Sequence, residues 1–228
     1  MSEGQALAQA APPRIWHMYR SMVGVGLVCG LLIVSVFELT RPVIERNKAE
    51  ALSRAIFRVL PDARSSTAFR LGDAGHFERL EGGTGVGPAV YGGYDAQHRL
   101  VGIAVQAEGM GYQDVIRVLY GYSVAKDAIT GLQVLESRET PGLGDRIETD
   151  AAFLANFERL DVSLNDDQSA LVHPIQFVKQ GGKEHPWQVD GITGATISST
   201  AVAEIIGGSA SYWVARIRQN LDDFQSTE

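Results

Sequence analysis

The chain has 228 residues, of which 45% are hydrophobic and 21% are charged, so one or two ordinary folded domains are expected. Its net charge of −7 and a pI near 5.3 argue against nucleic acid as a partner, because proteins that bind nucleic acid present basic faces. The single cysteine, Cys29, excludes a disulfide, a Cys-x-x-Cys pair or a thiolate metal site within the chain.

An apolar segment near the N-terminus predicts a membrane-spanning helix. Residues 21–39 carry one charge, Glu38, at their far end. As a helix these roughly 19 residues span about 28 Å, which matches the hydrocarbon core of a bilayer. The alternative is a cleaved signal peptide, but the segment is long for one and no Ala-x-Ala-like cleavage site follows it. We therefore expect an uncleaved anchor, preceded by a tail of residues 1–20.

The charges that flank this segment do not decide its orientation. Two arginines precede it, whereas four basic residues follow it: Arg41, Arg46, Lys48 and Arg54. The difference slightly favours a cytoplasmic location for the following domain. Long domains, however, cross the membrane largely regardless of charge, so this indication is weak.

Residues 40–62 predict a stalk helix between the span and a folded domain. Apolar residues recur there at helical spacing, with charged residues between them. Pro42 suits an early position in this helix, and Pro61 ends it. We assign residues 63–222 to the folded domain and residues 223–228 to a polar, frayed tail.

The folded domain is expected to contain a meander of antiparallel strands. The predicted strands cover residues 89–94, 100–107, 115–122 and 129–137, with turns at 95–97, 109–111 and 126–127. A glycine-rich segment at 82–87 precedes them. It is not a dinucleotide-binding fingerprint, because its spacing fails and no strand leads into it, so we interpret it as a flexible loop.

The segment Glu139-Thr140-Pro141-Gly142-Leu143-Gly144 follows the last of these strands. Its Pro-Gly pair predicts a tight turn with a positive φ at the glycine. The loop presents a carboxylate, a hydroxyl and a leucine around backbone that a ligand can approach, and such a loop can hold a flat ring with polar edges. The alternative is a simple turn that leads into a helix expected at 145–159.

A second segment, Asp190-Gly191-Ile192-Thr193-Gly194-Ala195-Thr196-Ile197-Ser198-Ser199, follows a strand predicted at 175–179 and precedes a long helical pattern. Small residues let the backbone approach a bulky anion, and hydroxyls and free helical N–H groups can donate to it. The segment is therefore either a phosphate site or a helix start capped by Ser and Thr, and the two interpretations are compatible. The following helix should bury the stripe Val202, Ile205, Ile206, Trp213, Val214, Ile217 and Leu221.

The sequence lacks the residue patterns of self-sufficient catalysis. The five histidines do not have metal-ligand spacing, and neither a Walker A sequence nor a Gly-x-Ser-x-Gly elbow occurs. Redox chemistry on this chain would therefore require a cofactor.

The two segments together carry a resemblance. Residues 190–196 match the flavinylation pattern Asp-x-x-(Ser/Thr)-Gly-Ala-(Thr/Ser) at every fixed position, and residues 139–144 match a second family motif. With one N-terminal span and this length, the chain resembles the G subunit of the Rnf ion-translocating electron-transport complex. The C subunit of the Na⁺-translocating NADH:quinone reductase shares both motifs. The compact length and the lead-in at 136–139 favour the Rnf family.

The resemblance implies an α+β architecture: one N-terminal transmembrane helix, then an FMN-binding domain with an antiparallel sheet and flanking helices. It implies FMN joined covalently by a phosphoester bond to Thr196, attached by a flavin transferase that uses FAD. The chain would sit in the bacterial inner membrane as a single-pass protein, with residues 1–20 cytoplasmic and the C-terminal domain periplasmic. Its partners would be the lipid bilayer and the other subunits of a translocase that couples electron transfer between ferredoxin and NAD to Na⁺ or H⁺ movement.

The same resemblance assigns roles to the motif residues. Beside Thr196, the phosphate would be surrounded by Thr193, Gly194, Ala195, Ser198 and Ser199. The isoalloxazine ring would be bordered by Glu139, Thr140, Gly142 and Leu143. Asp190 would be read by the transferase or used in attachment, unless it only caps a turn. The alternatives are the corresponding subunit of the quinone reductase, a membrane-anchored flavin-binding regulatory protein, or a structural subunit in which the second segment is only a capped helix.

Overall fold

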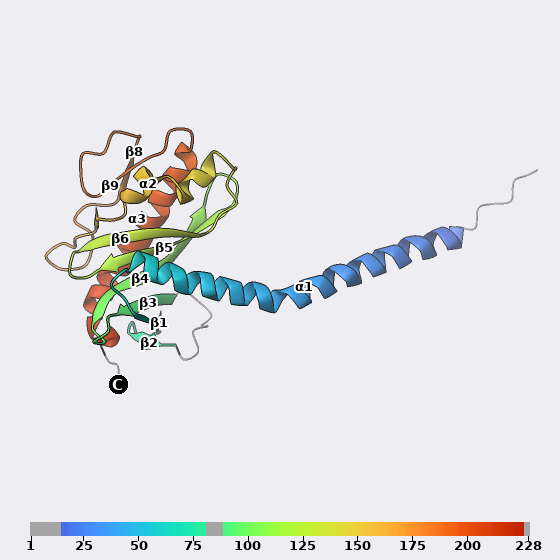
Figure 1. The fold of residues 1–228 in the computed structure, drawn as a ribbon, viewed down its shortest axis with the longest axis horizontal. Coiled ribbons are helices and arrows are strands. Elements are labelled where there is room, and N and C mark those ends of the chain that lie inside the picture. Colours follow the sequence, from blue (N-terminus) through green and yellow to red (C-terminus); the bar gives the residue numbers. More distant parts are fainter. Residues whose placement is uncertain (1–14, 81–88, 226–228) are drawn as a thin grey trace, which may run out of the picture. The chain divides into compact units, whose positions relative to one another are not determined.

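The computed structural model describes residues 15–80 and 89–225, which divide between two compact units, residues 1–49 and 50–228. Residues 1–14 of the tail expected at 1–20, and the glycine-rich segment at 82–87, lie outside the described residues. In the described part of the chain a long apolar helix precedes an antiparallel sheet with flanking helices, which confirms the predicted α+β class (Figure 1).

The first helix, α1, covers Ile15–Val59 without a break. Its apolar part reaches a mean hydropathy of 2.4 with no residue buried, so among the described residues it is long and apolar enough to cross a membrane. The stalk helix expected at 40–62 is the continuation of the apolar segment within this one helix, which ends at Val59. Pro42 lies inside α1, where its missing N–H removes one backbone hydrogen bond without ending the helix.

In the described part of the second unit, seven strands form one antiparallel sheet with the order β2-β1-β3-β4-β5-β6-β7. The strands are β1 Ser65–Leu71, β2 Phe77–Arg79, β3 Ala89–Tyr94, β4 Leu100–Met110, β5 Val115–Ser123, β6 Ala128–Glu136 and β7 Leu160–Asp161. A small parallel pair, β8 Gln176–Val178 and β9 Gln188–Asp190, leads to the helix α3 Thr196–Gln219.

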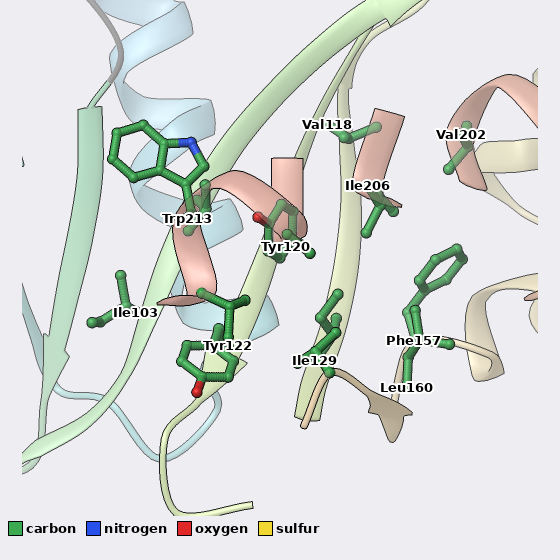
Figure 2. Close-up of a cluster of buried hydrophobic side chains, with 14 of the residues drawn as sticks. Ile103, Val118, Tyr120, Tyr122, Ile129, Phe157, Leu160, Val202, Ile206 and Trp213 are labelled. Carbon is green, nitrogen blue, oxygen red and sulfur yellow. The ribbon is translucent and has the colours of Figure 1, made fainter. Parts of the chain in front are cut away.

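The sheet is buried on both faces, because successive side chains of a strand point to opposite sides. In β4, Ile103 and Val105 belong to the core cluster that includes α3, whereas Ala104 between them belongs to the cluster formed with the end of α1. Figure 2 shows the first cluster, in which side chains of the sheet meet those of α3. It includes Ile103, Val118, Tyr120, Tyr122, Ile129, Phe157, Leu160, Val202, Ile206 and Trp213.

One close approach holds the end of α1 against the sheet. A Cβ placed on Gly121 would lie 2.3 Å from the carbonyl oxygen of Val59. Only a glycine in β5 lets the helix end come this close, and Thr130 donates to the same carbonyl at 3.1 Å. The sheet therefore accepts α1 through a gap in its side chains.

The four predicted central strands are confirmed, with differences at their ends. β4 continues to Met110, because it pairs with Val115 of β5, and the turn lies at 111–114 instead of 109–111. β1 and β2, which precede Ala89, were not predicted. The buried stripe expected on α3 is confirmed, with Ile205 only partly buried; Leu221 lies beyond α3, in the following 3₁₀ turn, and is also partly buried.

Two other expectations were wrong. The helix expected at 145–159 is instead a 3₁₀ turn, Gly144–Glu148, and a short helix, α2 Ala151–Ala155, because Asp150 caps α2 by accepting from the Phe153 N–H and so begins a new helix there. The expected tail is partly folded: Leu221–Phe224 form a 3₁₀ turn in which Phe224 is fully buried against Phe69 and Phe77.

Candidate functional site

The loop after β6 is organised around the buried carboxylate of Glu139. Its Oε1 accepts from the Gln113 backbone N–H at 3.0 Å, and its Oε2 accepts from the Ser198 hydroxyl at 2.5 Å. Two glycines make room for it: a Cβ on Gly111 or Gly144 would lie within 2.6 Å of a Glu139 oxygen. Glu139 therefore joins the first motif to α3 in the second.

The remainder of this loop faces outward. Gly142 has φ of 76°, which confirms the predicted positive-φ turn. Thr140 accepts from the Gln113 side-chain amide at 2.7 Å, and Leu143 exposes 53% of its surface. The loop thus combines a buried polar anchor with an exposed apolar side chain.

Asp190 shapes the loop that leads to the second motif. Its carboxylate accepts from the N–H groups of Gly181 and Gly182 at 2.9 and 3.2 Å, so it caps that turn. Asn156 brackets the Asp190 backbone, donating to its carbonyl and accepting from its N–H. The Lys183 ammonium donates to Asn156 Oδ1, and burial lowers the pKa of Lys183 although Asp190 nearby opposes that shift.

Thr196 is the first residue of α3 and its side chain is exposed. Before it, Gly194 turns the chain with φ of 88°, and buried Ala195 occupies the N-cap position. The expectation that a Ser or Thr hydroxyl caps this helix was wrong, since Ala195 offers none. The hydroxyls one turn later donate elsewhere, as Ser199 and Thr200 do to backbone carbonyls of the first turn.

The four side-chain hydroxyls of residues 190–199 divide into two groups. Ser198 and Ser199 are buried: Ser198 donates to Glu139, and Ser199 also accepts from the Ile192 N–H at 3.3 Å. Thr193 and Thr196 are exposed, and neither hydroxyl has a protein partner among the described residues. The buried pair fixes the turn, and the exposed pair is available to a ligand.

Sequence reasoning missed Arg146, which connects the two motifs at the surface. Its Nη1 donates to the Thr193 carbonyl at 2.8 Å, and its Nη2 donates to the Asp150 carboxylate at 2.7 Å. The hydrogen bond that Asp150 accepts from the Phe153 N–H lowers the pKa of Asp150 most, and the Arg146 guanidinium lowers it further. The one signal in the sequence that could have indicated a role for Arg146 is its position, because a basic residue two positions after the first motif lies close to a candidate anion site.

Exposed apolar side chains flank the contact between Glu139 and Ser198. Met110 and Tyr112 stand on either side of Gly111, Leu143 precedes Gly144, and Ile197 lies between Thr196 and Ser198. Each exposes more than half of its surface. In addition, the buried Oδ1 of Asp145 has no hydrogen-bond partner among the described residues. Both features are unusual on a free surface.

Known proteins with similar sequences match this chain over most of its length. The FMN-binding domain family matches residues 111–208, which include both motifs. The G subunit of an ion-translocating oxidoreductase complex from Methanosarcina acetivorans is 32% identical over 84% of this chain and 90% of its own. The G subunit from Shewanella piezotolerans is 28% identical over 86% and 91%.

Solved structures agree in fold. Shewanella oneidensis NqrC has a TM-score of 0.53 at 18% identity and covers 79% of this chain and 97% of its own. The C subunit of the Na⁺-translocating NADH-quinone reductase from Parabacteroides distasonis has a TM-score of 0.54 at 18% identity, with coverage of 80% and 96%. At this identity the likeness shows the architecture alone.

Proposed function

The chain belongs to the family of the G subunits of ion-translocating oxidoreductase complexes, and on that premise we propose that it is an electron-carrying subunit with FMN attached covalently to Thr196. When bound, FMN supplies the ability to accept and pass on electrons singly or in pairs. The protein supplies attachment, orientation and shielding. No side-chain acid–base pair is needed for that task.

The position of Thr196 is the observation that carries this proposal. Its hydroxyl is exposed, has no protein partner in the described structure, and begins a helix of 24 residues. The first N–H groups of α3 point out of the helix start and favour negative charge there. A phosphoryl group on this oxygen would meet those donors.

The surroundings of Thr196 fit the remainder of the flavin. The exposed apolar side chains of Met110, Tyr112, Leu143 and Ile197 offer a surface that a flat ring would cover. Glu139 and Thr140, which are committed to protein partners, would border the ring by holding the loop in shape.

We assign the other motif residues by their contacts. Gly194 and Ala195 leave room at the helix start, and the exposed Thr193 hydroxyl would donate to the phosphoryl oxygens. Ser198 and Ser199 would support this group indirectly, since both are buried and paired. Asp190 would present the motif to a flavin transferase by fixing its loop. In attachment, Thr196 would exchange its hydroxyl proton for the FMN phosphoryl group of FAD, with release of AMP.

The test of attachment uses Thr196→Ala and Thr196→Ser in the full chain, expressed with a flavin transferase. Denaturing gels scanned for flavin fluorescence should show a band for the wild type and none for Thr196→Ala. Thr196→Ser should retain part of the signal, because the chemistry needs only a hydroxyl. Thr200→Ala, one turn along the same helix, is the matched control and should remain fluorescent. A fluorescent Thr196→Ala band would exclude this attachment site.

We propose further that α1 anchors the chain in the inner membrane, with the FMN domain on the periplasmic side. The complex would move Na⁺ or H⁺ as electrons pass between ferredoxin and NAD. The support is the apolar window of α1, in which no residue is buried, together with the family. A cysteine placed at the exposed Gln97 in a Cys29→Ser background should react with an impermeant maleimide in intact cells. Labelling only after lysis would show that the domain lies on the cytoplasmic side and would contradict the proposed orientation.

A further inference from the structure

We propose that Arg146 is the cation that binds the phosphoryl group carried by Thr196. This inference rests on the proposed function, because it needs a phosphoryl group at that position. Arg146 belongs to neither motif, and the roles assigned above do not include it. Arg146 would fix the position of the cofactor's phosphate, and the phosphate in turn connects the flavin ring to Thr196.

The first observation is where the guanidinium lies. Arg146 Nη1 donates to the carbonyl of Thr193, three residues before the attachment residue. A Cβ built on Gly194 would come within 3.9 Å of the same nitrogen. The cation therefore rests directly on the turn that leads into Thr196.

The second observation is how the guanidinium is held. Asp150 accepts from Nη2 at 2.7 Å and also caps α2, so a carboxylate that is itself fixed orients the arginine. These contacts use two of the five N–H donors of a guanidinium, and the side chain remains 40% exposed. Donors remain for an anion, and arginine suits phosphoryl oxygens because its planar fork can donate twice.

The third observation is the shape of the backbone beneath it. Gly142 and Gly194, one in each motif, both have positive φ. Among the described residues other than the adjacent ones, none has an atom within 4 Å of a Cβ built on Gly142, and at Gly194 only the Arg146 guanidinium does. Space is thus left open on the side of the turn where Arg146 stands. A phosphoryl group there would be bordered by the arginine and the exposed Thr193 and Thr196.

The test compares two flavins that differ by the phosphate. Full-length chain carrying Thr196→Ala, solubilised in detergent, is titrated with FMN and with riboflavin. Adding Arg146→Gln should weaken FMN binding about tenfold and change riboflavin binding less than twofold. The variant loses a charged hydrogen bond to the phosphate of FMN, and riboflavin has no phosphate to make that bond. Adding Arg146→Lys should recover part of the FMN affinity.

Arg99→Gln is the matched control. Arg99 pairs with Asp95 at the same i,i+4 spacing as Arg146 with Asp150, but it lies at the opposite end of β4 from Gly111. It should change neither affinity. Equal weakening of both flavins by Arg146→Gln, or no weakening of either, would overturn the assignment, since a merely structural arginine affects both alike.

A second measurement decides the matter if these flavins bind too weakly without the covalent bond. The ³¹P resonance of the loaded wild-type chain is compared with those of loaded Arg146→Gln and Arg146→Lys. The Gln variant should shift toward the resonance of the proteolysed flavinyl peptide, and the Lys variant should lie between. An unchanged resonance in Arg146→Gln refutes the contact. A wild-type chain without flavin would instead refute the proposed function.

Discussion

The strands β3 to β6 and the two motif loops at 139–146 and 190–196 are stabilised differently. The strands share continuous backbone ladders and bury side chains on both faces. The loops contain short elements and depend on a few polar contacts, chiefly Glu139 with Ser198 and Arg146 with Thr193. The comparison indicates that most of the stability resides in the sheet, and that the proposed attachment residue lies in loops whose exposed side chains can change with little effect on folding.

Ile129→Ala should produce the largest loss of stability. Ile129 is fully buried in β6, and truncating such a side chain costs about 2–5 kcal/mol through lost burial and the cavity left behind. Urea unfolding of the detergent-solubilised chain measures it. The control is the same change at Ile197, which is 59% exposed beside Thr196 and should cost under about 0.5 kcal/mol. Similar losses at both positions would remove the distinction between sheet and loops.

Ser198→Ala should have the next largest effect, because it breaks the buried contact between the motifs. Losing a hydrogen bond to a charged group costs about 1.5–3 kcal/mol, and among the described residues the Glu139 carboxylate would retain only the Gln113 N–H as a donor. Flavin loading should fall as well. Thr200→Ala removes a hydroxyl two residues away that bonds only to the Thr196 carbonyl, so it should be nearly silent. If the two variants unfold alike, the contact between the motifs is unimportant.

The loss of stability at alkaline pH should come from buried tyrosines of the sheet. Burial raises the pKa of Tyr122 to about 12, so between pH 10 and 12 the unfolded chain loses a proton that the folded chain keeps. The contribution of Tyr122 to the free energy of unfolding is therefore complete below pH 10. It falls as the pH rises through this window, by about 1 kcal/mol at pH 11. Tyr122→Phe should make the decline smaller, and part of it should remain because burial also raises the pKa of Tyr120 and Tyr91. A decline of equal size in this variant would assign it to other groups.

Thr196→Ala should have the smallest effect on folding and the most complete effect on attachment. The side chain is exposed and makes no hydrogen bond within the described residues, so its removal should change stability by under about 0.5 kcal/mol. Covalent flavin should be absent. Unfolding of the flavin-free chain in urea, beside flavin-free wild type, gives the comparison. A loss as large as that of Ser198→Ala would mean that Thr196 belongs to the scaffold.

How much the sequence predicts follows the same division. The central strands and the buried stripe of α3 carry periodic patterns of apolar residues along the sequence, so their positions were predicted to within a few residues. β1 was missed because it pairs with β3 across the chain and carries a weak alternating pattern. The contacts of Arg146 and Phe224 join residues far apart in sequence, and no local spacing reveals them. The motifs point to Thr196 as the proposed attachment residue, but only the fold shows what surrounds it.

The most direct test of the central claim is the intact mass of the full chain purified from cells that contain a flavin transferase. The account predicts one added FMN less one water, found after proteolysis on the peptide that carries Thr196. An unmodified mass under these conditions, or flavin on any other peptide, would contradict it.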